Sequence, residues 1–567
     1  MRDRYDKPLI VQSDLTVLLD ESKPDAWQAR EKLVLFADAV RRAGTVHTYK
    51  MSALTLWNAA SAGICGDEIC RWLTEYGRYE LPFQTEAAVR KLSGRYGKLR
   101  LTTDGGKLLL HGDLDVMEEL AHSASVTCFV LAKRSPDIWE LKKEERGSFK
   151  QELTRLGYPV IDLAGYHAGE ELSVRMKPIT SAGGRPFALR DYQRAAVELF
   201  YKEGTVQGGS GVIVLPCGAG KTVVGIAALA RNSRATLILT SNGTSVKQWK
   251  EELLDKTTLT EQEVGQYSGT MRQVRPVTIA TYHILTHRSS KDAPFSHMKL
   301  FSERDWGLII YDEVHLLPAP VFRMTADIQA TRRLGLTATL VREDGCAEDV
   351  YSLIGPKLYD MQWKTAETEA YIAAVSCTEI RVPLHMDKEE PYREASARSK
   401  LRLAAENPGK MAIVRQLLRE HEGKPTLIIG QYLNQLHEIA DRLGAPLLTG
   451  EMPQQERQRL YERFKEGAIS VLIVSKVANF AVDLPDAAVA IQLSGSFGSR
   501  QEEAQRIGRL LRPKKGDNSA WFYSIVTDET KETEFAMRRQ LFMLEQGYRY
   551  DRMNMPIGAL AEGDGAP

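Results

Sequence analysis

The chain has 567 residues, enough for three to four domains of ordinary size. Its 75 basic and 74 acidic side chains nearly cancel, which excludes a positive field over the whole molecule; nucleic-acid binding would need local basic grooves. The six cysteines are scattered, and only Cys65 and Cys70 are close in sequence, so we expect reduced structural thiols rather than a zinc site.

The first ten residues lack the continuous apolar segment of a signal peptide. Nowhere do apolar residues run for the ~18 positions that a membrane span needs. These features predict a cytoplasmic protein with no membrane partner, which we expect to be a monomer.

The pattern between residues 1 and 115 is typical of a small mixed α+β accessory domain. The apolar spacing of Leu33, Phe36 and Val40 predicts an amphipathic helix over 27–42. Short helices followed by a hairpin favour a winged-helix-like arrangement. The other expected elements are strands at 8–12 and 15–19, helices at 67–76 and 85–92, and a strand pair within 98–110.

Residues 116–177 form a second small unit, and beyond it strands and helices alternate, the pattern of parallel α/β sheets. Two series of strands predict two tandem α/β units, over 178–364 and 365–550. The charged segment 365–407 is expected to connect them and to carry an insertion, and the tail 551–567 to be disordered. The expected strands are 211–215, 235–240, 277–280, 308–311, 333–337, 425–429, 471–474, 489–493 and 521–526.

A glycine-rich loop, with Gly218 and Gly220, joins an apolar strand to a helical pattern that begins at Lys221 and Thr222. Its glycines let the backbone wrap around a polyphosphate, and the first N–H groups of the helix point at it. Lys221 can reach the β- and γ-phosphates, and the Thr222 hydroxyl can ligate Mg²⁺. Leu215 replaces the first glycine of the usual pattern. The alternative is a glycine-rich turn with a surface lysine.

Two carboxylates, Asp312 and Glu313, follow the apolar run 308–311, and parallel α/β sheets bind ligands where their strands end. Asp312 can bind Mg²⁺ and Glu313 can orient the water that attacks the γ-phosphate. A chance acidic pair is the alternative on this stretch alone. Together with Lys221 and Thr222, the pair predicts an ATPase.

Two further motifs complete the candidate set. Thr337-Ala-Thr339 follows a strand and offers two hydroxyls that could couple the nucleotide to the neighbouring unit, or that could only shape a turn. The second unit holds arginines spaced by three, which a helix places on adjoining positions. They are either a solvated basic face or residues that reach the transition-state charge; the stretch comprises Gln505, Arg506, Gly508, Arg509 and Arg512.

In this order the motifs resemble those of superfamily 2 helicases, and more narrowly XPB-type DNA helicases in their bacterial form. The narrower resemblance rests on Arg342-Glu343-Asp344, on the stretch 475–485, and on 147–166, which is similar to the damage-recognition domain of that family. It extends over nearly the whole chain. It implies two RecA-like domains, with a short thumb-like insertion in the second, preceded by small α+β accessory domains.

The resemblance also implies residue roles. Arg190 and Gln193 would bind the adenine side, His315 would couple the nucleotide to the second unit, and Asp483 would lie on the ribose side or in the metal network. Arg509 and Arg512 would be arginine fingers, and Arg342, Glu343 and Asp344 would help to split the duplex. Ala481 departs from the glycine that relatives often have, and the thumb-like insertion near 387–403 is short.

The resulting hypothesis is an ATP- and Mg²⁺-dependent DNA helicase or translocase with 3′ to 5′ polarity, acting on single strands and forks, in repair, with a nuclease as a candidate partner. Two alternatives stay open. One is an RNA helicase, because Asp-Glu-x-His motifs occur there too. The other is an ATP-switched assembly subunit that opens DNA little or not at all.

Overall fold

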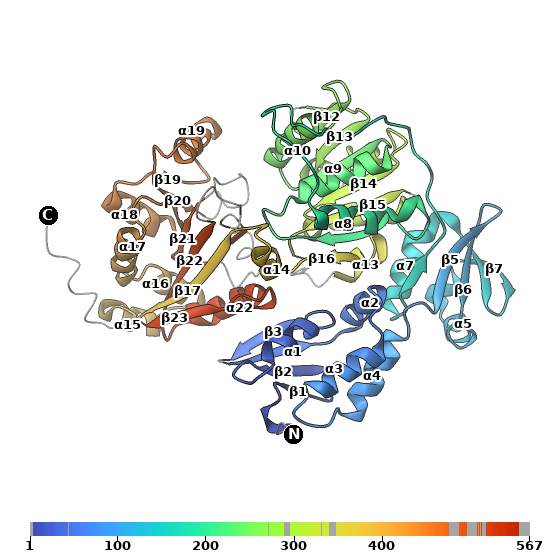
Figure 1. The fold of residues 1–567 in the computed structure, drawn as a ribbon, viewed down its shortest axis with the longest axis horizontal. Coiled ribbons are helices and arrows are strands. Elements are labelled where there is room, and N and C mark those ends of the chain that lie inside the picture. The colour runs from blue at the N-terminus through green and yellow to red at the C-terminus, as the bar shows by residue number, and fades with distance from the viewer. Residues whose placement is uncertain are drawn as a thin grey trace. The chain divides into compact units, whose positions relative to one another are not determined.

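The computed structural model describes residues 4–43, 45–269, 271–288, 295–329, 331–339, 347–475, 487–495, 507–508, 510, 512 and 518–554. The chain divides into two compact units, one made of Met1–Leu215 with Gly220–Asp360, the other of Met361–Pro567 with Pro216–Ala219. The predicted architecture is confirmed: small α+β domains come first along the chain, and two tandem RecA-like parallel-sheet domains follow them (Figure 1). Within the described part of the chain, none of the helices combines the length and apolar character that a bilayer crossing requires.

The first unit opens with a four-stranded antiparallel sheet, packed with helices around a single core. The expected helix over 27–42 is wrong in its second half, where strand β3 pairs with β4. Val40 is 50% exposed there instead of lying on an apolar helix face. In sheet order the strands are β1 (Leu9–Val11), β2 (Thr16–Asp20), β4 (Val46–Lys50) and β3 (Asp38–Ala43), and the helices are α1 (Ala26–Leu33), α2 (Ala53–Ser61), α3 (Gly66–Glu75) and α4 (Phe83–Ser93).

A five-stranded sheet follows, and the predicted hairpin β5–β6 is part of it. The predicted domain boundary at residue 115 therefore runs through this sheet, because β5 and β6 pair with strands on the far side of that boundary. In sheet order the strands are β7 (Val130–Ser135), β8 (Ile138–Leu141), β6 (Lys107–Gly112), β5 (Leu99–Asp104) and β9 (Val160–Asp162), and the helices are α5 (Leu114–Ala121), α6 (Ala124–Thr127) and α7 (Arg146–Arg155).

The first α/β domain contains a seven-stranded sheet whose named pairs are all parallel. Four of the strands, β11, β13, β14 and β15, are buried almost throughout, as the apolar runs in the sequence predicted. In sheet order they are β12 (Val264–Tyr267), β13 (Val277–Thr281), β11 (Thr236–Thr240), β14 (Leu308–Asp312), β15 (Arg332–Thr337), β10 (Ser210–Val214) and β16 (Lys357–Asp360).

Helices pack on both faces of this sheet. Alternate strand residues, such as Leu237, Ile309 and Tyr311, form a core with α12 and α13, while α9 and α10 contact strands of the sheet through their own buried sides. The helices are α8 (Asp191–Tyr201), α9 (Lys221–Asn232), α10 (Gly243–Lys256), α11 (Tyr282–Leu285), α12 (Ala319–Asp327) and α13 (Ala347–Leu353).

Helix α7 of the second small domain packs against α12 and α13. The contact is close, because a Cβ at Gly147 would come within 2.3 Å of the Ala326 carbonyl oxygen. The second small domain carries an ionic cluster made of Arg146, Lys150 and Asp162, and Gln329 of the first α/β domain contacts it. Asp162 accepts hydrogen bonds from Arg146 Nη2 (2.6 Å) and Lys150 Nζ (3.0 Å), and Lys150 Nζ also donates to Gln329 Oε1 (2.8 Å). The ion pairs lie within the 116–177 segment, and the hydrogen bond from buried Lys150 to Gln329 links this cluster to the first α/β domain.

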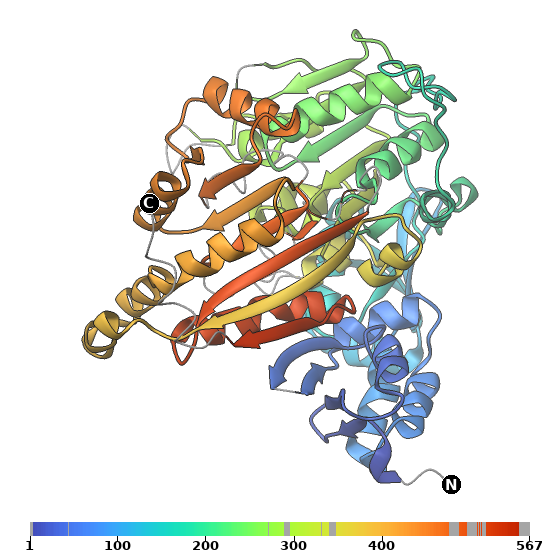
Figure 2. The same cartoon turned by 60° about the vertical axis from the view of Figure 1, so that its left-hand side comes forward.

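The second unit contains another seven-stranded sheet with parallel pairs, in which β17 and β22 are nine residues each and run side by side (Figure 2). The segment expected to be a connection therefore contains a strand of the sheet. Its remainder forms the helix pair α15 and α16, where the thumb-like insertion was expected. In sheet order the strands are β19 (Leu447–Leu448), β20 (Val471–Ser475), β18 (Thr426–Gly430), β21 (Val489–Gln492), β22 (Ser519–Thr527), β17 (Ala374–Val382) and β23 (Tyr550–Asn554).

The first four residues of the expected tail belong to strand β23, and the rest lies outside the described residues. The helices of this unit are α14 (Trp363–Thr368), α15 (Met386–Glu394), α16 (Ala397–Ala405), α17 (Gly409–Glu420), α18 (Leu433–Leu443), α19 (Gln454–Lys465) and α22 (Lys531–Glu545).

Candidate active site

The carboxyl ends of three neighbouring strands, β14, β15 and β10, carry most of the predicted site residues. The glycine-rich loop follows β10, and α9 begins at Lys221. Gly218 and Gly220 have φ of +81° and +80°, which side-chain-bearing residues rarely adopt, so both glycines are required by the backbone. Thr222 lies half-buried in the first turn of α9. The predicted strand–loop–helix arrangement is present.

Helix α8 contributes the side chain that packs on this loop. Gln193 is buried in the first turn of α8, and a Cβ at Gly220 would come within 2.7 Å of its Nε2. The main-chain N–H of Arg190 donates to Gln193 Oε1 at 3.0 Å, which fixes the amide with Nε2 facing the loop. Arg190 itself is exposed at the start of the helix. The structure thus brings Gln193 against the loop.

Strand β14 delivers Asp312 and Glu313 to the same edge. Lys221 Nζ lies 3.7 Å from Glu313 Oε1, and both side chains are largely shielded from solvent. Glu313 adopts a left-handed backbone conformation, with φ of +51°, which is uncommon for a residue with a side chain and is typical of functional sites.

A contact chain continues from Glu313 into β15. His315 Nδ1 lies 3.5 Å from Glu313 Oε2 and 2.7 Å from Thr337 Oγ1. The Thr337 hydroxyl donates its hydrogen to the Thr339 carbonyl oxygen, which leaves the hydroxyl oxygen as the acceptor for a protonated His315 Nδ1. The Thr339 N–H in turn donates to Thr337 Oγ1 at 3.1 Å. Residues 337–339 therefore form a turn closed by hydrogen bonds between Thr337 and Thr339, and His315 links this turn to Glu313.

Asp312 is held by two aromatic side chains. Trp249 Nε1 donates to Asp312 Oδ2 at 2.8 Å, and the Tyr282 hydroxyl donates to the Asp312 carbonyl oxygen at 2.9 Å. Burial and the neighbouring Glu313 carboxylate raise the pKa of Asp312 to about 6, although Trp249 and Lys221 oppose this shift. Sequence reasoning missed Trp249 and Tyr282; the only signal was a tryptophan on the apolar face of the helix after β11.

Asp312→Asn is expected to stabilise the nucleotide-free protein at pH 8. Because folding raises the pKa of Asp312 from 3.8 to about 6, the stability that goes with its proton is complete below pH 3.8 and is lost as the pH rises through about 6. The neutral amide avoids this loss, which is worth about 2–3 kcal/mol at pH 8. Thermal unfolding of both proteins at pH 8 and pH 4 checks it; a Tm difference that is equal at the two pH values would contradict it.

Several predicted site residues lie outside the described residues, so the site geometry given above does not include them. Arg512 is half-buried in the second unit. The residues outside are Arg342, Glu343, Asp344, Asp483, Gln505, Arg506 and Arg509.

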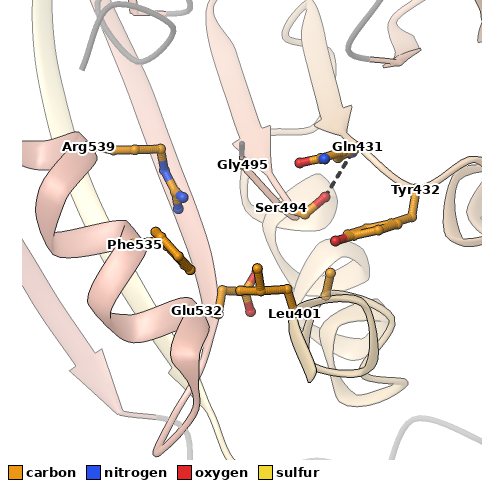
Figure 3. A pocket seen from close by; sticks show the side chains of 9 residues that line it. Leu401, Gln431, Tyr432, Ser494, Gly495, Glu532, Phe535 and Arg539 are labelled. Atoms are coloured by element: carbon orange, nitrogen blue, oxygen red, sulfur yellow. Dashed lines mark hydrogen bonds between the residues drawn. The ribbon is translucent and has the colours of Figure 1, made fainter. Parts of the chain in front are cut away.

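The second unit has a pocket of its own, at the carboxyl ends of β18 and β21 (Figure 3). Ser494 Oγ accepts a hydrogen bond from the main-chain N–H of Gln431 at 2.8 Å. Glu532, at the start of α22, forms a fully buried ion pair with Lys410 at 2.8 Å, and this pair fixes one wall. The remaining lining residues are Leu401, Ala405, Tyr432, Gly495, Phe535 and Arg539.

Comparison with known proteins gives three matching family models: "ERCC3/RAD25/XPB C-terminal helicase" over residues 366–560, "Helicase conserved C-terminal domain" over 9–135, and "Type III restriction enzyme, res subunit" over 186–342. A "DNA 3'-5' helicase XPB" from Kineococcus radiotolerans is 49% identical, covering 96% of each chain. The protein of that name from Mycobacterium tuberculosis is 46% identical, covering 96% of this chain and 97% of the relative. A "General transcription and DNA repair factor IIH helicase/translocase subunit XPB" from Antonospora locustae is 31% identical, covering 96% and 81%.

Proposed function

Because this chain belongs to the XPB family of helicases, we propose that it is an ATP-dependent DNA helicase or translocase that couples ATP hydrolysis to the opening of duplex DNA in repair. One observation carries the assignment of the ATP site: the contact chain from Lys221 through Glu313 and His315 to Thr337, at the carboxyl edge of adjacent parallel strands. The 3′ to 5′ polarity is extended to this chain from the names of the two bacterial relatives above.

The chain's own groups suit each part of the hydrolysis. Lys221 and the N–H groups at the start of α9 bind the β- and γ-phosphates, and Gln193 with Arg190 binds on the adenine side. Glu313 orients the attacking water, since its carboxylate is held by Lys221 and His315 at the edge where the phosphates end.

Thr222 and Asp312 fit a Mg²⁺ ion. Hydroxyl and carboxylate oxygens are the ligands that Mg²⁺ prefers. The pKa of Asp312 is raised partly by Glu313, so negative charge is in excess here and a divalent cation would relieve it. Mg²⁺ bound there with ATP would neutralise phosphate charge during transfer.

The contact between His315 and Thr337 supports a coupling role, because it joins the water-orienting carboxylate to the end of the next strand. We assign Thr339 to the same turn. For residues outside the described part we keep the roles that family membership implies: Arg342, Glu343 and Asp344 in strand separation, Asp483 on the ribose side or in the metal network, and Gln505 and Arg506 in coupling.

Arg512→Lys is expected to lower kcat at least about tenfold, with a much smaller change in ATP affinity. Arg509 and Arg512 are proposed as arginine fingers, which stabilise charge in the transition state, and lysine lacks the planar fork that does so. Steady-state ATPase rates with nucleotide Kd, measured with and without DNA, test it. If the lysine variant kept a near-parental kcat, the arginine-finger role would be wrong, and these arginines would be a solvated basic face.

Strand displacement and ATPase stimulation, compared across DNA and RNA, test the proposed function itself. A DNA helicase is stimulated by DNA and displaces a strand, an RNA helicase prefers RNA, and an ATP-switched assembly subunit hydrolyses ATP with little unwinding. A Glu313→Gln preparation purified alongside gives the background rate. We expect DNA to stimulate the ATPase and the protein to displace a DNA strand as a monomer. The candidate nuclease partner would be identified by its effect on the DNA products.

A further inference from the structure

Trp249 reaches the candidate metal ligand from a helix that none of the predicted motifs includes. It lies on α10 with Val246 and Leu253 on the buried face of that helix, and its side chain is 1% exposed. Its indole nitrogen donates to Asp312 Oδ2 at 2.8 Å. An indole N–H can only donate a hydrogen bond, so Asp312 must be the acceptor, and the contact favours its charged carboxylate form.

The indole is fixed by the elements around it. Helix α9, which starts at Lys221, has Gly225 where the ring passes: a Cβ there would come within 2.5 Å of Trp249 Cη2 and 3.0 Å of Leu336 Cδ1. The absence of a side chain at Gly225 therefore makes room for the ring between α9 and β15. A ring packed in this way cannot change rotamer without moving α9.

Besides the indole of Trp249, the main-chain N–H of the adjacent Glu313 also hydrogen-bonds the Asp312 carboxylate. Tyr282 holds only the carbonyl oxygen of the aspartate, and the nearby charges pull in opposite directions, since Lys221 attracts the carboxylate and Glu313 repels it. Without the indole N–H, the carboxylate loses the side-chain hydrogen bond that opposes the pull of Lys221, and it would turn away from a metal held with Thr222. With it, Oδ2 is fixed by the indole, and the carboxylate keeps one direction in which it can meet the metal.

We propose that Trp249 is a positioning residue for the Mg²⁺–ATP site: by binding one oxygen of Asp312 it presets the carboxylate for the metal, and Gly225 is the position that makes this contact possible. The inference rests on the proposed function, because Asp312 must be the metal ligand. Trp249 acts through Asp312, the group to which its indole N–H donates.

The test compares Trp249→Phe with Trp306→Phe. Trp306 is a matched control: it is 2% exposed, lies in the same α/β domain, and donates its indole N–H to the Leu300 carbonyl oxygen at 2.8 Å. Both variants lose one buried indole hydrogen bond. Trp249→Phe should raise the Mg²⁺ concentration for half-maximal activity by about 10- to 100-fold, the usual cost of losing a group that orients a metal ligand, whereas Trp306→Phe should leave it within about twofold.

Binding without turnover supplies the second readout. The parental protein should gain Tm with Mg²⁺ and ADP together, and Trp249→Phe should need correspondingly more Mg²⁺ for the same gain. In protein with ¹⁵N-labelled tryptophan, which has eight indole groups, the signal absent from Trp249→Phe should shift on Asp312→Asn and on Mg²⁺–ADP binding. Signals from the other indoles, Trp306 included, should move much less.

Gly225→Ala covers the case in which Trp249→Phe does not fold. The added methyl displaces the ring, so this variant should also raise the Mg²⁺ requirement while keeping the indole N–H. Parental Mg²⁺ dependence in whichever variant folds, or an equal shift in Trp306→Phe, would overturn the role of Trp249. A parental protein that hydrolyses no ATP would instead overturn the proposed function.

Discussion

Glu313→Gln is expected to lower kcat for ATP hydrolysis by roughly 10³-fold, within the range by which a positioned general base accelerates reactions. The amide has the shape of the carboxylate but cannot accept the proton of the attacking water. ATP affinity should stay within a few-fold of the parental value, because the substitution removes a negative charge near the phosphates and leaves Lys221 in place. Single-turnover hydrolysis and nucleotide Kd with and without Mg²⁺ measure the two effects separately.

Two comparisons make this result specific. Lys221→Ala should lose nucleotide affinity together with kcat, because Lys221 contacts phosphates in the ground state as well as in the transition state. Glu303→Gln, which removes a surface carboxylate paired with Lys299 in the same domain, should behave like the parent. If Glu313→Gln lost nucleotide binding to the same extent as turnover, the water-orienting role of Glu313 would be wrong.

The glycine-rich loop and the Asp312–Glu313 pair were predictable because a buried parallel strand is recognisable in the sequence as a continuous apolar run. The unbroken apolar runs before the glycine-rich loop and before Asp312 place both motifs at strand ends, and parallel strands end at one edge. Sequence spacing could not reveal Trp249, because a tryptophan on the apolar face of a helix looks like any core residue until the fold brings Asp312 to it.

Two errors in the fold prediction have physical causes. In 27–42 the apolar residues fit both a helix and a short strand, and pairing of β3 with β4 overrode the helical pattern. Strand β17 was missed because Ser376, Thr378 and Glu379 interrupt its apolar pattern; Glu379 is buried through hydrogen bonds from Arg381 and Gln540, which the sequence does not show. Buried polar groups with distant partners defeat local pattern reading.

Asp162→Asn is expected to destabilise the first unit by about 3–5 kcal/mol, the usual cost of breaking a buried ion pair by removing one partner. Asp162 is nearly buried between Arg146 and Lys150, so the neutral amide leaves two buried cations of the 116–177 segment under-compensated. Chemical denaturation of the intact protein measures the change, followed by a signal from the first unit.

The pH dependence gives this expectation a sign. Burial alone would raise the pKa of Asp162, but Lys150 and Arg146 hold it well below its usual value of 3.8. The contribution of Asp162 to stability is therefore complete above pH 3.8 and is lost as the pH falls. The difference in free energy of unfolding between the parent and Asp162→Asn should accordingly become smaller in acid. A gap of constant size across this range would mean that Asp162→Asn acts by disturbing packing and not by removing charge.

Glu140→Gln is the matched control, because Glu140 also bridges an arginine and a lysine in the same domain, Arg134 at 2.8 Å and Lys107 at 3.2 Å, but with exposed partners. Solvent compensates those cations when the charge is removed, so the control should unfold close to the parental midpoint. Burial also lowers the pKa of Lys150 to about 8, so Lys150 already costs stability at neutral pH. Adding Lys150→Met to Asp162→Asn should therefore recover part of the loss, since one buried cation that lacks its carboxylate is removed with it.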